Sequence, residues 1–98
     1  MTITKTLNGS ELEMSIGGRL DTTTAPELEG ALNESLEGIE KLIFDFASLE
    51  YISSAGLRVI LATQKKMSKQ GEFVLKNVSD DVQEVFDITG FSDILTII

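Results

Sequence analysis

The sequence lacks cysteine and histidine altogether, has no tryptophan and contains a single proline. Without cysteine, the chain forms no disulfide and offers no thiolate for catalysis or metal binding. Without histidine, it lacks the commonest general base, the commonest transition-metal ligand and the usual partner of a nucleophilic serine. We therefore expect a protein that is not an enzyme and that uses no metal or other cofactor.

Basic residues are also scarce, because 8 lysines and arginines stand against 16 aspartates and glutamates, for a net charge of −8. Nucleic acids and anionic membrane surfaces attract positive charge, so binding to either is not expected. A basic protein partner would be attracted, although solubility alone also explains an acidic surface. No apolar run reaches the roughly 18 residues that span a bilayer, and the first residues lack a signal-peptide pattern. We expect a cytoplasmic protein.

The residues that are present suit one ordered domain over residues 1–98, since 42% of them are hydrophobic. Two alternating segments around the turn signal Asn8-Gly9 predict an N-terminal hairpin, ended by Gly17-Gly18. Helical patterns follow from Thr24, Ser54 and Ser79. Apolar segments between them predict strands at Lys41–Phe46, Glu72–Lys76 and Ile94–Ile98.

The predicted order β-β-α-β-α-β-α-β indicates an α/β domain with a mixed sheet, parallel in most of its core, and helices packed on that sheet. Leu42, Ile43 and Phe44 follow one another without a polar residue between them. Such a run is typical of a strand that is buried on both faces, so we expect helices on both sides of the sheet.

The strongest functional signal lies where the central strand leads into the second helix. A short loop after Asp45 is followed by Ser53-Ser54-Ala55-Gly56. A structural explanation is that one serine caps the helix and the glycine allows close packing. The functional explanation is that a hydroxyl at a helix N-terminus accepts a phosphate, which adds about −1.5 to −2 charges. Asp45 and Glu50 are expected to lie near that charge and oppose it.

A second polar loop precedes the first helix, with Asp21 followed by three threonines, Thr22–Thr24. Turn chemistry explains this pattern, and Thr24 and Glu27 have the spacing of a capping box. A nucleotide-binding module built on Asp21 and Thr22–Thr24 is a weaker alternative, because neither a Walker P-loop nor a GxGxxG motif accompanies them. If Asp21 lies beside Ser54, both belong to one recognition surface.

Three motifs together resemble the STAS domain in its bacterial anti-sigma factor antagonist form. They are the segment from Asp45 to Leu61, the Gly18-Arg19-Leu20-Asp21 motif before a helix, and the Phe86–Phe91 motif that ends one. The resemblance covers nearly the whole chain.

This resemblance implies a mechanism. The unphosphorylated antagonist binds an anti-sigma factor, which is also an ATP-dependent serine kinase, and so frees a sigma factor. The kinase then phosphorylates the antagonist, and a PP2C-type phosphatase reverses the modification. By position the phosphoacceptor is Ser54, while Ser53 stands where some members have aspartate and is the expected cap. The residues implied in partner binding are Asp21, Thr22, Ser53, Ser54, Ala55, Gly56, Leu57 and Arg58.

An alternative within the same family is a constitutive STAS interaction subunit of a transporter or another signalling assembly. In that case Ser54 is only a cap of the helix, and binding does not depend on phosphorylation.

Overall fold

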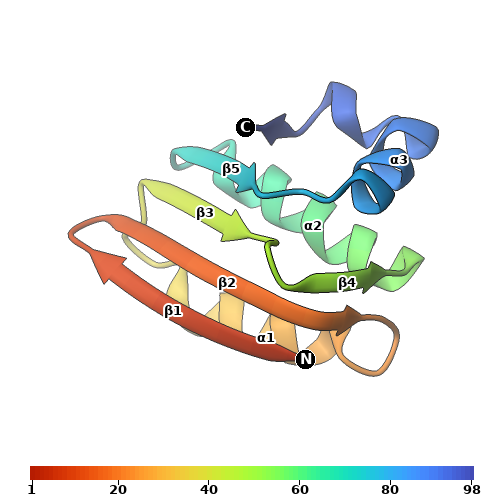
Figure 1. The fold of residues 1–98 in the computed structure, drawn as a ribbon. Helices are drawn as coiled ribbons and strands as arrows, with labels where there is room; N and C mark the ends of the chain where they lie inside the picture. Colours follow the sequence, from red (N-terminus) through yellow and green to blue (C-terminus); the bar gives the residue numbers. More distant parts are fainter.

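The chain begins with the predicted hairpin, in which β1 (Thr2–Asn8) and β2 (Glu11–Leu20) run antiparallel. The structure is a computed structural model that describes all 98 residues (Figure 1). Asn8 pairs with Glu11, so the turn is Gly9-Ser10, one position later than predicted. Gly9 has a φ of +65°, which glycine adopts without the steric cost of a side chain.

β2 is 10 residues long, and on the side away from β1 it pairs with two strands in succession. β3 (Lys41–Asp45) pairs in parallel with its first half, and β4 (Leu49–Ile52) pairs in parallel with its end. The pairing of β2 with β1 ends at Gly17, as predicted, but β2 itself does not: Gly18, at φ +84°, adjoins a bulge, and Arg19 and Leu20 beyond it continue the strand beside β4. β4 lies where the sequence predicts a short loop, because its apolar residues Leu49 and Ile52 stand at the two ends and do not alternate as in a half-buried strand.

Three helices and two further strands complete the domain, with a 3₁₀ turn near the end. The sheet order is β1-β2-β3-β5-β6, and every pairing except β1–β2 is parallel. This is the predicted mixed α/β fold, with β4 and the 3₁₀ turn added and the last strand shortened. The remaining elements are α1 (Ala25–Ser35), α2 (Ser54–Met67), β5 (Glu72–Lys76), α3 (Asp80–Thr89), η1 (Phe91–Asp93) and β6 (Thr96–Ile97).

α1 and α2 lie together on one face of the sheet, behind it in Figure 1, and the face toward the viewer is uncovered. β2, β3 and β5 follow one another across the sheet in chain order, so right-handed crossovers place successive helices on the same face. The prediction of helices on both faces is therefore wrong. In β3, Leu42 and Phe44 are buried under the helices, whereas Ile43 points to the open face and is half-buried.

The hydrophobic core fills the space between the sheet and the two helices. α3 lies beyond the carboxyl end of β5 and buries Val82 and Phe86 (Figure 1). No helix combines the length and the apolar character needed to cross a membrane. The largest side chains that are almost fully buried include Met14, Ile16, Leu28, Leu42, Phe44, Ile60, Met67, Leu75 and Phe86.

Candidate functional site

The two polar turns singled out in the sequence lie side by side at the carboxyl ends of β2 and β4. Arg19 pairs with Tyr51 and Leu20 with Ile52, and the Ser53 amide donates a hydrogen bond to the Leu20 carbonyl over 2.9 Å. One turn then leads from β2 into α1, and the other leads from β4 into α2. The parallel pairing of the missed strand β4 is thus what brings the two motifs together.

Ser54 is the first residue of α2, and its side chain is exposed. None of the hydrogen bonds within the protein uses its hydroxyl. Ser53 occupies the N-cap position, with extended φ and ψ of −101° and 176°, but its side chain makes no capping bond. Its Oγ is buried and has no hydrogen-bond partner. The predicted cap is therefore right in position and wrong in its hydrogen bond.

Gly56 holds this end of α2 against the strands beneath it. A Cβ added at this position would lie 2.7 Å from Leu20 Cγ and 3.0 Å from Ile52 Cγ1. Both distances are shorter than ordinary van der Waals contact, so only glycine fits without movement of its neighbours. The close packing that the sequence suggested for Gly56 is present.

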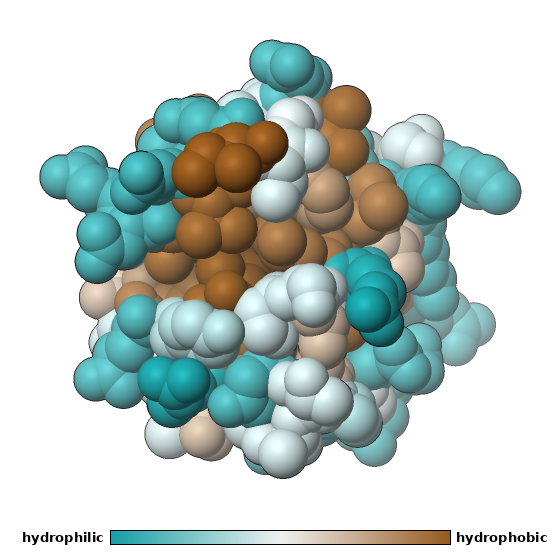
Figure 2. Space-filling view, turned by 90° about the vertical axis from the view of Figure 1, so that its right-hand side faces the viewer, coloured by the Kyte–Doolittle hydropathy of each residue, from teal (hydrophilic) through white to brown (hydrophobic).

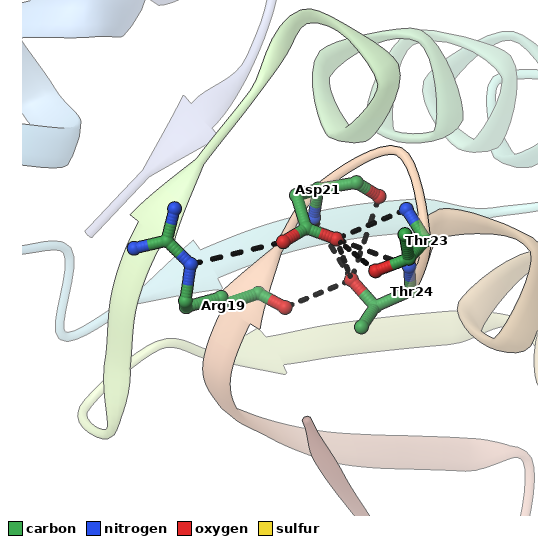
Figure 3. A network of polar contacts seen from close by, with 4 residues as sticks. All are labelled: Arg19, Asp21, Thr23 and Thr24. Carbon is green, nitrogen blue, oxygen red and sulfur yellow. Dashed lines mark hydrogen bonds and ion pairs between the residues drawn. The ribbon is translucent and has the colours of Figure 1, made fainter.

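The neighbouring turn is held by a dense polar network around Asp21 (Figure 3). Asp21 Oδ1 accepts hydrogen bonds from the Thr23 hydroxyl at 2.7 Å, from the Thr23 amide at 3.0 Å and from the Thr24 amide at 3.2 Å. The Thr24 hydroxyl donates to the Arg19 carbonyl over 2.8 Å and accepts from the Asp21 amide. It forms no capping bond to α1, so the predicted capping box is wrong.

These hydrogen bonds favour the charged form of the Asp21 carboxylate. The Thr23 hydroxyl, helped by the amides of Thr23 and Thr24, holds the pKa of Asp21 below its ordinary value despite some desolvation. The Arg19 guanidinium lies 3.7 Å from the other carboxylate oxygen and sits 4.2 Å from the centre of the Tyr51 ring. Arg19 thereby links the β2–α1 turn to β4.

Asp45 and Glu50, the two acids expected near Ser54, make their contacts elsewhere. Asp45 accepts hydrogen bonds from the Asn77 side chain at 2.9 Å and the Ala47 amide at 3.0 Å, and these bonds lower its pKa, the Asn77 bond most. Glu50 lines a hollow beside Asp81 of α3. Neither carboxylate makes a hydrogen bond to Ser54.

The remaining residues of the predicted partner surface divide by depth. Thr22, Ala55 and Arg58 line one hollow between α1 and α2, where Thr22 and Arg58 are exposed and Ala55 is half-buried. Gly56 and Leu57 are buried, Leu57 to 8% exposure, so they support the surface from beneath. No group of three or more acidic side chains comes together to hold a metal ion.

An apolar area on this end of the molecule was not singled out from the sequence. Figure 2 shows it as a brown centre bordered by polar side chains. On the α3 side, a hollow of about 170 Å³ is lined by Tyr51, Ile52, Val82 and Val85, with two acids at its rim. Ile88 of α3 is 78% exposed. The helical period would have indicated this, because Ile88 lies off the stripe formed by the buried residues of α3.

Comparison with known proteins identifies the fold and the family. The STAS domain family model matches residues 2–98. BtrV of Bordetella bronchiseptica is 39% identical over 82 residues, which cover 82% of this chain and 71% of BtrV. The anti-sigma-B factor antagonist of Bacillus subtilis is 34% identical over 91 residues, covering 92% and 84% of the two chains.

Solved structures of anti-sigma factor antagonists have the same fold. Unphosphorylated SpoIIAA, an anti-sigma factor antagonist, superposes with a TM-score of 0.84 at 17% identity, over 99% of this chain and 88% of SpoIIAA. SpoIIAA has also been solved in its phosphorylated form, with a TM-score of 0.77 over 99% of this chain and 91% of that one, at 16% identity. These relatives are regulatory binding proteins, in agreement with the expectation of a chain that is not an enzyme. The chain belongs to the STAS domain family.

Proposed function

We propose that the protein is an anti-sigma factor antagonist whose binding is switched off by phosphorylation of Ser54. The observation that carries the proposal is the exposed Ser54 hydroxyl, which starts α2 and serves no hydrogen bond of the fold. It stands beside the ordered Asp21 turn, in a chain whose relatives include an anti-sigma factor antagonist.

In the proposed cycle the unphosphorylated chain binds an anti-sigma factor serine kinase in the cytoplasm and a sigma factor is released. The Ser54 Oγ then attacks the γ-phosphorus of ATP in the kinase. The new Oγ–P bond replaces the bond to the β-phosphate oxygen, ADP leaves, and the hydroxyl proton passes to a base of the kinase. A PP2C-type phosphatase hydrolyses the phosphoserine and restores the binding form.

Charge accounts for the switch without a change of fold. A phosphate adds about −1.5 to −2 charges near neutral pH. The N-terminus of α2 tolerates this charge, so the protein itself loses little stability. A partner that buries the same surface must desolvate the dianion, which is costly unless it is paired. The apolar area beside the turn, including Tyr51 and Val85, would supply the contact area that the unmodified form offers to a partner.

The first test is phosphorylation itself. The chain is incubated with an anti-sigma factor serine kinase from its own organism and ATP, and its intact mass is measured. We expect the mass of one phosphate to be added to the wild type and to Ser53→Ala, the matched neighbouring serine, and not to Ser54→Ala. Undiminished phosphorylation of Ser54→Ala would rule out the assigned site.

The second test is binding to the same kinase by calorimetry. Ser54→Ala should bind like the wild type, while Ser54→Asp, which carries only part of the charge, should bind at least about tenfold more weakly, or about 1.4 kcal/mol. Equal affinities for the two variants would contradict charge control and would favour the constitutive interaction subunit.

A further inference from the structure

The charges of the two covering helices are separated by sign. α1 has three glutamates and no basic residue, whereas α2 has Arg58, Lys65 and Lys66 and no acidic residue. The two helices pack side by side, yet none of the three ion pairs of the protein involves either of them. Acidic and basic stripes therefore run next to each other with their charges unpaired.

A groove follows the line between these stripes. Three hollows lie along it, of about 390, 70 and 570 Å³, and neighbouring hollows share lining residues. The first and the second hollow share Glu29, Val59 and Ala62, and the second and third share Asn33 and Lys66. Small and aliphatic side chains make up about half of the lining of the first two hollows, whereas the third is lined mostly by polar residues.

Opposite charges stand at matching heights across this groove. Glu29 and Arg58 line the hollow near Ser54, and Glu37 and Lys66 line the hollow at the other end. Both helices return between parallel strands, so they run in the same direction. A twofold axis along the groove would lay α1 of one copy on α2 of the other and keep these heights. Each glutamate would then meet the cation of the second copy at its own level.

We propose that this groove is the interface of a homodimer, with a second copy of the chain as its occupant. Its lining holds three carboxylates and two cations, so it is nearly neutral, although the whole chain carries −8. Two copies that meet there bring opposite charges together and keep most of their acidic surface apart. The same surface is self-complementary only about this axis, because an axis across the groove would place α1 on α1.

The size of the face predicts a weak dimer. A helix of 14 residues is about 21 Å long, and two packed helices are about 20 Å wide. The contact is therefore about 400 Å² for each copy, which is at the low end of specific interfaces. The hollow near Ser54 is also lined by Thr22 and Arg58, so a dimer would cover part of the surface proposed above for the partner.

The test uses charge reversal at the end of the groove that is remote from the proposed phosphorylation site. Sedimentation equilibrium of the full chain is measured over a wide range of concentration. Glu37→Lys and Lys66→Glu should each weaken self-association about tenfold, because two attractive pairs become repulsive. The double variant Glu37→Lys/Lys66→Glu should restore it, and an equimolar mixture of the single variants should form a heterodimer.

Lys65→Glu is the matched control, because it changes the net charge as Lys66→Glu does but lies outside the lining of the groove. It should dimerise like the wild type. A wild type that stays monomeric at every concentration would overturn the proposal, and so would an equal effect of Lys65→Glu and Lys66→Glu. Neither result depends on phosphorylation, so failure here leaves the proposed function to its own tests.

Discussion

The turns that leave β2 and β4 lie side by side, but different forces hold them. The β2–α1 turn is fixed by polar contacts, with Asp21 accepting from the amides of Thr23 and Thr24 and from the Thr23 hydroxyl. The β4–α2 turn is fixed by apolar packing, with Gly56 seated on Leu20 and Ile52. The side chains of Asp21, Thr23 and Thr24 in the first turn are hydrogen-bonded within the fold, while both serine hydroxyls of the second turn are unbonded.

The difference explains how a small domain keeps a hydroxyl available for modification without losing the shape around it. A serine that caps a helix through its side chain has its oxygen occupied, and a phosphate there would break the cap. Because the packing of Gly56 holds the start of α2, the Ser54 hydroxyl is not needed to cap the helix. Under the proposed function, the hydrogen-bonded turn beside it would form part of the surface that the partner binds.

The largest effect should follow from disturbing the packed turn. Gly56→Ala forces a Cβ into Leu20 and Ile52, and overpacking of this kind costs about 1–3 kcal/mol, less up to about 1 kcal/mol of helix propensity. We expect a lower free energy of unfolding, measured by urea denaturation. Gly30→Ala is the matched control, because nothing lies within 4 Å of its Cβ, and it should be neutral or stabilising. Equal stabilities of the two variants would refute the packing account.

A smaller, pH-dependent effect should follow from disturbing the polar turn. Hydrogen bonds lower the pKa of Asp21, so its contribution is complete above the pKa of the unfolded chain and is lost as pH falls through the folded value. Asp21→Asn should therefore lower the Tm at neutral pH, and the difference from wild type should shrink below about pH 4.

The control for this prediction is Asp93→Asn, because Asp93 is exposed and its carboxylate makes no hydrogen bond or ion pair. Its Tm should follow the wild type at every pH. A Tm difference for Asp21→Asn that stays constant with pH would show that the network does not depend on the carboxylate charge.

Most of the fold could be predicted because its elements carry strong local signals. Ser54 was placed correctly at the start of α2, and the left-handed Gly90 ends α3 as expected. The errors arose where local signals are weak. β4 lacks an alternating pattern, and Ile43 belongs to an apolar run although strand order leaves its face open. Which face a helix covers depends on topology, and a short segment does not encode topology.

The structure brings together the two turns that the sequence singled out, but the hydrogen bonds within those turns were predicted less well. Sequence spacing suggested hydrogen-bonded caps at Ser53 and Thr24, yet neither hydroxyl caps its helix. The Thr24 hydroxyl instead donates to the Arg19 carbonyl within its own turn, and Ser53 Oγ is buried at the point where β4 pairs with the end of β2. Long-range pairing of this kind is read from the structure and not from residue spacing.

The smallest expected effect concerns the two serines at N-cap positions, Ser79 of α3 and Ser53 of α2. Ser79 caps α3 through a hydrogen bond from the Val82 amide at 3.3 Å, so Ser79→Ala should cost about 1 kcal/mol. Ser53 occupies the same position on α2 with no such bond, so Ser53→Ala should change the free energy of unfolding by less than about 0.5 kcal/mol. Both values come from urea denaturation. A cost for Ser53→Ala as large as that for Ser79→Ala would mean that the Ser53 hydroxyl is bonded after all, and the β4–α2 turn would then be held by polar contacts like its neighbour.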